Sequence, residues 1–224
     1  MSIKGFLSRN LVQRWREGRV WALILGIPGF IRDWRRYRRK GGKGAKLADW
    51  FPQIGDATSL TTFDPHYLYQ SAWAARGIAS AAPPFHVDVG SQIDLVAPLS
   101  GFVPVEFIDL RPLRMAVDGL QCVRGSILAL PHADHSLPSV SCLHVIEHIG
   151  LGRYGDEIDP DGSVKACREL QRVLGRRGSL FVSVPVGRSR VEFNAHRVFS
   201  PDFLPAAMPD LRLAGFWAPG AFLT

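Results

Sequence analysis

Beyond Phe85 the chain alternates short apolar runs with amphipathic stretches. The runs have the length and β-branched content of strands, and they span residues 85–89, 105–110, 120–123, 139–145, 179–184 and 211–217. Between them, residues 94–102 and 160–174 show helical spacing, and Ser200-Pro201-Asp202 is a typical helix start. This alternation predicts an α/β fold, a mostly parallel sheet with helices on both faces.

The N-terminal part has a different pattern. Residues 1–46 interleave tryptophan and aliphatic side chains with arginines, which predicts a basic, amphipathic helical extension. Residues 47–84 have mixed helical spacing and end at Ala81-Ala82-Pro83-Pro84, which favours a helical lead-in to the first strand. We therefore expect three parts: the extension at 1–46, the lead-in at 47–84 and the α/β domain at 85–224.

The charge of the chain is divided in the same way. Residues 1–46 hold 13 Lys/Arg against 2 Asp/Glu, whereas residues 47–224 hold 14 against 18, although the whole chain carries +7. A mildly acidic body disfavours nucleic acid as its substrate. The basic extension fits an anionic membrane surface, packing of its tryptophans on the domain behind it, or contact with nucleic-acid phosphates, and the interleaved aromatics favour the membrane.

The apolar run at residues 20–31 bears on localisation. Twelve residues rise only about 18 Å as a helix, against a hydrocarbon core of roughly 30 Å. Charged residues follow the run where a signal peptide would have a cleavage site. The three cysteines, Cys122, Cys142 and Cys167, have no CxxC spacing and fit buried free thiols in a reducing compartment. We expect a cytoplasmic protein, peripheral to the inner membrane.

Two predicted strand ends carry polar residues suited to a nucleotide cofactor. Asp88, Gly90 and Ser91 end the first strand, and Asp109 ends the second. A glycine there lets the backbone approach a ligand, and an acid 21 positions after Asp88 can accept hydrogen bonds from ribose hydroxyls. The alternative is that both acids simply end strands at a solvated edge.

The string His144-Val-Ile-Glu147-His148 allows several interpretations. On a helix, His144, Glu147 and His148 would share a face and could bind a divalent metal, and the string also matches the HxxEH motif of zinc peptidases. A predicted strand before it and Gly150 and Gly152 after it disfavour the necessary long helix, so we expect no metal. His144 or His148 could instead act as a general base, or each could be a core-edge histidine. His196, in a later loop, could orient a substrate.

Four segments resemble class I S-adenosylmethionine (SAM)-dependent methyltransferases, which have a Rossmann-like fold. These are HVDVGS (86–91), FIDLRP (107–112), GSILALPHADHSLPSVSCLHVIEHIG (125–150) and ELQRVLGRRGSLFVSVPVG (169–187). The stretch FDPHYLYQSAWAARGIA (63–79) further resembles a poorly characterised methyltransferase-like group that occurs with bacterial surface-polysaccharide genes.

The resemblance implies roles for particular residues. Asp88 and Gly90, with Ser91, would line the methionine end of SAM, and Asp109 would hold the ribose. Ser126 and Ile127 would flank the adenine, and His144 would lie near the sulfonium. The implied activity is methyl transfer to a glycan or lipid-linked sugar in cell-surface polysaccharide synthesis.

Three positions depart from the family pattern. Gln92 and Asp94 replace the second and third glycines of the DxGxGxG loop, and Ser126 replaces the usual adenine-contacting Asp. A side chain at the glycine positions narrows the approach of the backbone to the cofactor. These departures leave open a second hypothesis, a non-catalytic module of the same fold that serves membrane-apposed assembly or binding. NAD-dependent oxidoreduction is disfavoured because GxGxxG is absent.

Overall fold

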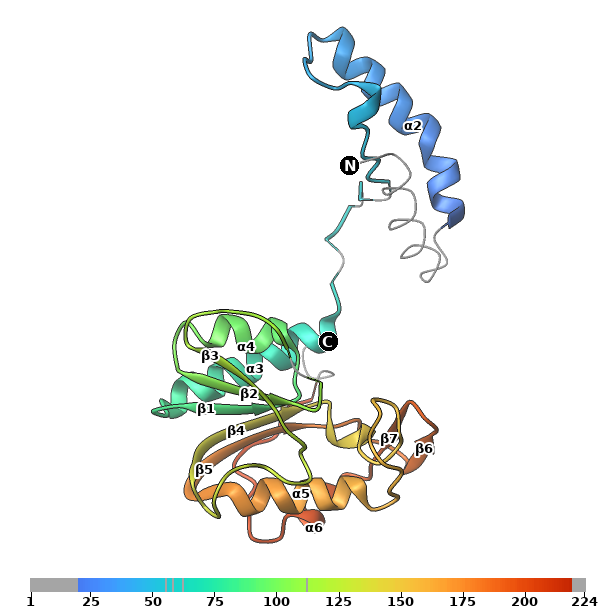
Figure 1. Cartoon of the computed structure of the whole chain (residues 1–224). Helices are drawn as coiled ribbons and strands as arrows, with labels where there is room; N and C mark the ends of the chain where they lie inside the picture. Colours follow the sequence, from blue (N-terminus) through green and yellow to red (C-terminus); the bar gives the residue numbers. More distant parts are fainter. Residues whose placement is uncertain (1–19, 55, 58, 62, 112, 219–224) are drawn as a thin grey trace. The chain divides into compact units, whose positions relative to one another are not determined.

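The computed structural model describes residues 20–54, 56–57, 59–61, 63–111 and 113–218 (Figure 1). The chain divides into two compact units, residues 1–63 and 64–224. The predicted lead-in is thus shared between them, since residues 47–63 belong to the first unit and its helix at 65–81 belongs to the second. The first nineteen residues of the predicted extension lie outside the described residues.

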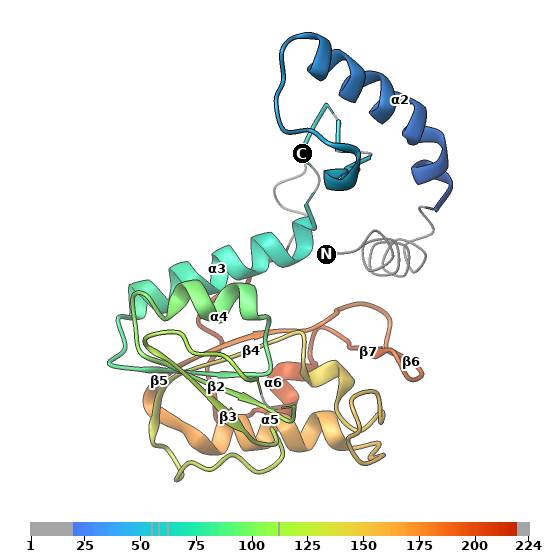
Figure 2. The same ribbon diagram turned by 45° about the horizontal axis from the view of Figure 1, so that its top comes forward.

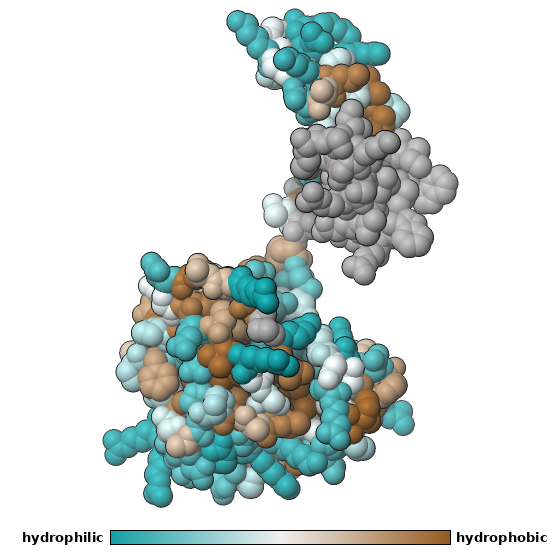
Figure 3. All heavy atoms as spheres, in the orientation of Figure 1, coloured by the Kyte–Doolittle hydropathy of each residue, from teal (hydrophilic) through white to brown (hydrophobic). Residues whose placement is uncertain are grey.

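The first unit contains helix α2 (Val20–Arg39) and the short 3₁₀ helix η1 (Leu47–Asp49). Trp50 packs edge-on against Phe30 and Trp34, with ring centroids 5.2 and 5.1 Å apart, and the Trp34 indole donates to the Ala45 carbonyl. Trp34 therefore packs on Trp50 within the first unit. The basic end of α2 stays exposed, and Figure 3 shows hydrophilic side chains gathered there beside an apolar patch. Within the described part of the chain, no helix is both long and apolar enough to cross a bilayer.

The second unit is built on a five-stranded sheet. Its strands are β1 (His86–Val89), β2 (Val105–Asp109), β3 (Leu120–Arg124), β4 (Leu137–Leu143) and β5 (Leu174–Ser183). Their order across the sheet is β3-β2-β1-β4-β5, and every pair of neighbours is parallel. The predicted parallel sheet is confirmed.

Helices cover both faces of this sheet (Figure 2). Helices α3 (Pro65–Ala81) and α4 (Ile93–Leu99) pack on one face, where Ile78 and Val96 meet Phe107 in a buried cluster. Helices α5 (Gly162–Val173) and α6 (Phe203–Ala207) cover the other face, through Leu170 and neighbouring buried side chains. These layers are those of the predicted Rossmann-like fold.

Two elements differ from the prediction. No strand forms over residues 211–217, where the apolar side chains of Leu213 and Phe216 are exposed. Instead, a short antiparallel hairpin of β6 (Arg190–Glu192) and β7 (His196–Val198) lies upstream. Strands of three residues are too short for their alternation to be recognised in the sequence. The three cysteines are free, as predicted, and two of them are buried.

Candidate functional site

The carboxyl ends of β1, β2 and β4 border a cavity of about 670 Å³. That volume lies within the usual range of about 300–1,000 Å³ for small-molecule sites, and this edge of a parallel sheet is where such folds bind ligands. The lining comes from the ends of the three strands and the segments that follow them, from α3 and α4, from the segment between β5 and β6, and from β7. The residues that line it are Tyr67, Gly90, Ser91, Gln92, Ile93, Phe107, Asp109, Arg111, Leu113, Leu143, His144, Glu147, His148, Arg153, Tyr154, Pro185 and His196.

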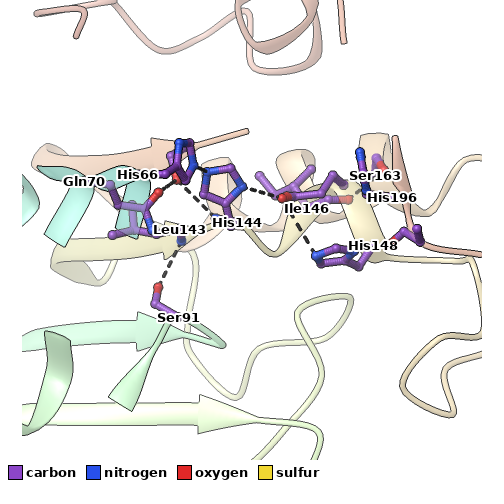
Figure 4. A network of polar contacts seen from close by, with 12 residues as sticks. His66, Gln70, Ser91, Leu143, His144, Ile146, His148, Ser163 and His196 are labelled. Atoms are coloured by element: carbon purple, nitrogen blue, oxygen red, sulfur yellow. Dashed lines mark hydrogen bonds and ion pairs between the residues drawn. The ribbon is translucent and has the colours of Figure 1, made fainter. Parts of the chain in front are cut away.

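The turn after β1 is tied to its neighbours on both sides. Gly90 has a φ of +70°, and its N–H donates to the Ile108 carbonyl of β2 over 2.9 Å. An added Cβ would lie 3.2 Å from Val145 Cγ1, so both backbone conformation and space favour glycine here. The Ser91 hydroxyl accepts from the Leu143 N–H of β4 over 3.0 Å (Figure 4). Gly90 and Ser91 both line the cavity, and the sequence analysis predicts that both contact the cofactor.

Asp88 supports this turn from below and is not among the lining residues. Its carboxylate is fully buried, accepts the Ser91 N–H over 2.9 Å and accepts the Ser141 hydroxyl. Burial raises the pKa of Asp88 to about 6. The prediction that Asp88 lines the cofactor site is therefore wrong: Asp88 positions Ser91 and does not face the cavity.

Asp109 lines the cavity at the end of β2. The register pairs Val89 with Ile108, which brings the turn at Gly90 next to Asp109. One carboxylate oxygen, Oδ1, accepts the Arg111 N–H over 2.7 Å and lies 3.6 Å from Arg111 Nε. Among the described residues no hydrogen bond or ion pair reaches Oδ2, so this oxygen can accept from a ligand hydroxyl.

The two residues that replace family glycines do not fill the cavity. Gln92 is exposed, caps the start of α4 through its backbone and forms part of the lining. Asp94 is exposed and lies outside the lining. The cavity next to Gly90 is therefore open although Gln92 and Asp94 both carry side chains.

Ser126 and Ile127, predicted to flank the adenine, are absent from the lining. The Ser126 hydroxyl accepts the Leu128 N–H within a local turn, and Ile127 is buried in the core on the α5 side of the sheet. Apolar contacts at this end of the cavity come instead from Ile93, Phe107 and Leu113.

The histidines and Glu147 follow β4 on a short 3₁₀ helix, η2 (Ile146–His148). His144 precedes it with a φ of +54°, an uncommon conformation for a residue other than glycine. The zinc-peptidase interpretation is therefore wrong, because no α-helix carries both histidines. No group of three or more His, Cys, Asp or Glu side chains in the described ranges is arranged to bind a metal ion.

Glu147 lies between the two histidines. Its Oε1 is 2.7 Å from His144 Nδ1 and 3.8 Å from His148 Nε2. The side chain is buried, and no described residue forms a hydrogen bond with Oε2, although Glu147 lines the cavity. An unpaired buried carboxylate oxygen is costly, so the site favours a ligand that donates a hydrogen bond to Oε2.

The two histidines differ in what their rings contact. Both ring nitrogens of His144 are engaged, Nδ1 by Glu147 and Nε2 by His66 Nε2 of α3 (Figure 4). His148 Nδ1 donates to the Ala195 carbonyl over 2.6 Å, which leaves a lone pair on Nε2 when the ring is neutral. Burial lowers the pKa of His148 and so favours that neutral form.

His196 lies on the far side of His148, on β7. Its Nε2 is 3.3 Å from Glu192 Oε2, and the His148 and His196 ring centroids are 6.4 Å apart. Both residues line the cavity, as the prediction of a substrate contact requires.

Several lining residues escaped the sequence analysis, namely Tyr67, Arg111, Arg153 and Tyr154, and so did His66 behind His144. Tyr67 and His66 lie in the segment assigned to the lead-in. The other three lie in loops whose course depends on packing rather than on local pattern. One signal was present: Arg111 follows the predicted cofactor acid Asp109 by two positions.

The order of the strands, the helices on both faces and the cavity at the carboxyl edge define a Rossmann-like fold. Among solved structures, YcgJ of Bacillus subtilis shares this fold with a TM-score of 0.50 at 17% identity, over 64% of this chain and 67% of its own.

Two further structures are similar to a lesser degree. One is a Galdieria sulphuraria protein with a proposed sarcosine dimethylglycine methyltransferase activity (TM-score 0.49, 17% identity, 65% of this chain), of which the match spans only 61%. The other is the 1,6-didemethyltoxoflavin-N1-methyltransferase of Burkholderia thailandensis, solved with S-adenosylhomocysteine (TM-score 0.48, 14% identity, 85% of this chain and 76% of that one).

Sequence comparisons add little to this. Residues 133–216 match the family described as "Caenorhabditis protein of unknown function, DUF268", which covers less than half of the chain. No curated protein matches the chain.

Proposed function

We propose that the second unit binds SAM in the cavity and transfers its methyl group to an oxygen or nitrogen of an acceptor. The observation that carries this proposal is one cavity bordered by both the Gly90 turn and the Asp109 carboxylate. Gly90 and Ser91 line the cavity at the carboxyl end of β1, and Asp109 Oδ2 is available to ribose hydroxyls. The S-adenosylhomocysteine bound to the Burkholderia enzyme of similar fold supports the choice of cofactor.

SAM would supply an electrophilic methyl group. The protein then has to align the acceptor and accept its proton. His148 suits the second role, because its Nδ1–H is fixed by Ala195 and its Nε2 retains a lone pair at the cavity. His144, with both nitrogens engaged, suits a positioning role: it orients Glu147. Of the two bases predicted, we favour His148.

The acceptor we propose is a sugar, in a glycan or linked to a lipid at the cytoplasmic face of the inner membrane. The support is the resemblance of residues 63–79 to a polysaccharide-associated group and the arginine-rich end of α2. Arginines beside aromatic side chains suit the headgroups of anionic lipids.

Calorimetry with SAM and S-adenosylhomocysteine tests the cofactor. We expect binding by the wild type and a roughly 10- to 100-fold loss of affinity in Asp109→Asn, since a hydrogen bond to a charged group contributes about 1.5–3 kcal/mol. Asp94→Asn is the matched control, because Asp94 is an exposed carboxylate outside the cavity.

The absence of heat at high micromolar ligand would contradict the proposal and favour the alternative, a non-catalytic module for membrane-apposed assembly. If Asp109→Asn and Asp94→Asn bind SAM with equal affinity, the cofactor does not contact Asp109 at the end of β2.

A further inference from the structure

Three side chains stack at the His148 end of the cavity. The guanidinium carbons of Arg111 and Arg153 lie 4.5 and 5.0 Å from the centroid of the Tyr154 ring. All three residues line the cavity. Stacking on an aromatic ring holds a guanidinium in a defined place at low cost, because its N–H edge remains available for hydrogen bonds.

The two arginines differ in their electrostatic partners. Arg111 lies 3.6 Å from the Asp109 carboxylate, whereas no carboxylate pairs with Arg153 among the residues that the structure describes. Arg153 Nη1 donates to the Ala195 carbonyl over 2.9 Å, which fixes the guanidinium and leaves its Nε–H and Nη2–H groups for a ligand. Arg153 is thus a charged group of the cavity that is oriented but has no carboxylate partner among the described residues.

Arg153 is also adjacent to the proposed base. Its Nη1 lies 3.3 Å from His148 Nδ1, and both side chains meet at the same carbonyl, that of Ala195. The nearby Glu147 Oε2 needs a hydrogen-bond donor. One ligand could satisfy both demands if it carried an anionic group and a hydroxyl or amine close together.

We propose that the acceptor is an anionic molecule whose phosphate or carboxylate binds Arg153 while its hydroxyl or amine lies between Glu147 Oε2 and His148 Nε2. This inference rests on the proposed function and narrows its substrate class. A planar guanidinium binds phosphate and carboxylate with two parallel hydrogen bonds, so the shared chemistry is that of an oxyanion.

The test measures oxyanion binding to the full chain after it has been saturated with S-adenosylhomocysteine. Inorganic phosphate, pyrophosphate and acetate are titrated separately by calorimetry. We expect at least one of them to bind the wild type and to bind Arg153→Gln at least 10-fold more weakly, with Arg153→Lys between the two. Arg177→Gln, an exposed arginine on β5 outside the cavity, should match the wild type.

The probes separate the sources of the oxyanion. Binding of phosphate or pyrophosphate alone assigns a phosphate ester, and binding of acetate assigns a carboxylate. If no probe binds the loaded protein, or if Arg153→Gln binds as tightly as Arg177→Gln, the inference is wrong. Failure of S-adenosylhomocysteine itself to bind is seen in the first titration and contradicts the proposed function instead.

Discussion

The substitution Asp88→Asn tests the buried network that supports the cavity turn. His86 on β1 contacts the hydroxyls of Ser139 and Ser141 on β4 through its two ring nitrogens, each over 2.8 Å, and Ser141 in turn donates to Asp88. Burial raises the pKa of Asp88 to about 6 and lowers the pKa of His86 to about 4. Asn preserves the shape of the Asp88 side chain and removes its titration, and its NH2 group takes the place of Oδ2, so that it donates to the Ser141 hydroxyl instead of accepting from it.

The two shifts act on the free energy of unfolding with opposite sign. The native state keeps the Asp88 proton up to about pH 6, whereas the unfolded chain loses it near 3.8, so stability falls as the pH rises through this window. The unfolded chain protonates His86 near 6.5 and the native state only near 4, so stability rises with pH between these values. Each effect is about 3 kcal/mol over its full window, because tenfold in proton affinity equals about 1.4 kcal/mol.

In the wild type the two effects should therefore largely cancel, whereas in Asp88→Asn the pH dependence of stability that comes from His86 should be measurable. Between pH 5 and pH 7.5, Asp88 and His86 together should raise the free energy of unfolding of the wild type by less than about 1 kcal/mol. In Asp88→Asn, His86 alone should raise it by about 2 kcal/mol, and all other titrating groups contribute equally to the two proteins. Urea unfolding at the two pH values measures both, with Asp94→Asn as a control that should parallel the wild type. If Asp88→Asn also parallels the wild type, the assigned pKa shift is refuted.

Three further outcomes are expected. Gly90→Ala should lose about 1–2 kcal/mol in urea unfolding and weaken S-adenosylhomocysteine binding in calorimetry, because a side chain is strained at φ +70°, whereas Gly215→Ala, which has open space, should do neither. His148→Gln should lower methyl transfer from radiolabelled SAM by about 100-fold or more without changing SAM affinity. Replacing the exposed arginines 35, 36, 38 and 39 by Gln should abolish flotation with anionic vesicles, at about 1 kcal/mol each, and unchanged flotation would remove the membrane proposal.

Local pattern determined the fold and half of the candidate site. Strand and helix periodicities were sufficient to predict the parallel sheet, because each element buries an apolar face that the sequence displays. Gly90, Ser91 and Asp109 could be located on the cavity from sequence because parallel strands bring their carboxyl ends to one edge. The prediction of a strand over residues 211–217 was wrong, since apolar character alone does not bury a segment against the sheet.

The other half depended on contacts between distant segments. His66 and His144 are 78 positions apart and meet only because α3 packs on the sheet beside β4 and β5. Ala195, far from His148 in sequence, selects the ring nitrogen that faces the cavity. The sequence thus determined which residues could react, whereas tertiary packing decided which of them are buried, paired or left without a partner, because burial and hydrogen bonding are properties of the assembled layers.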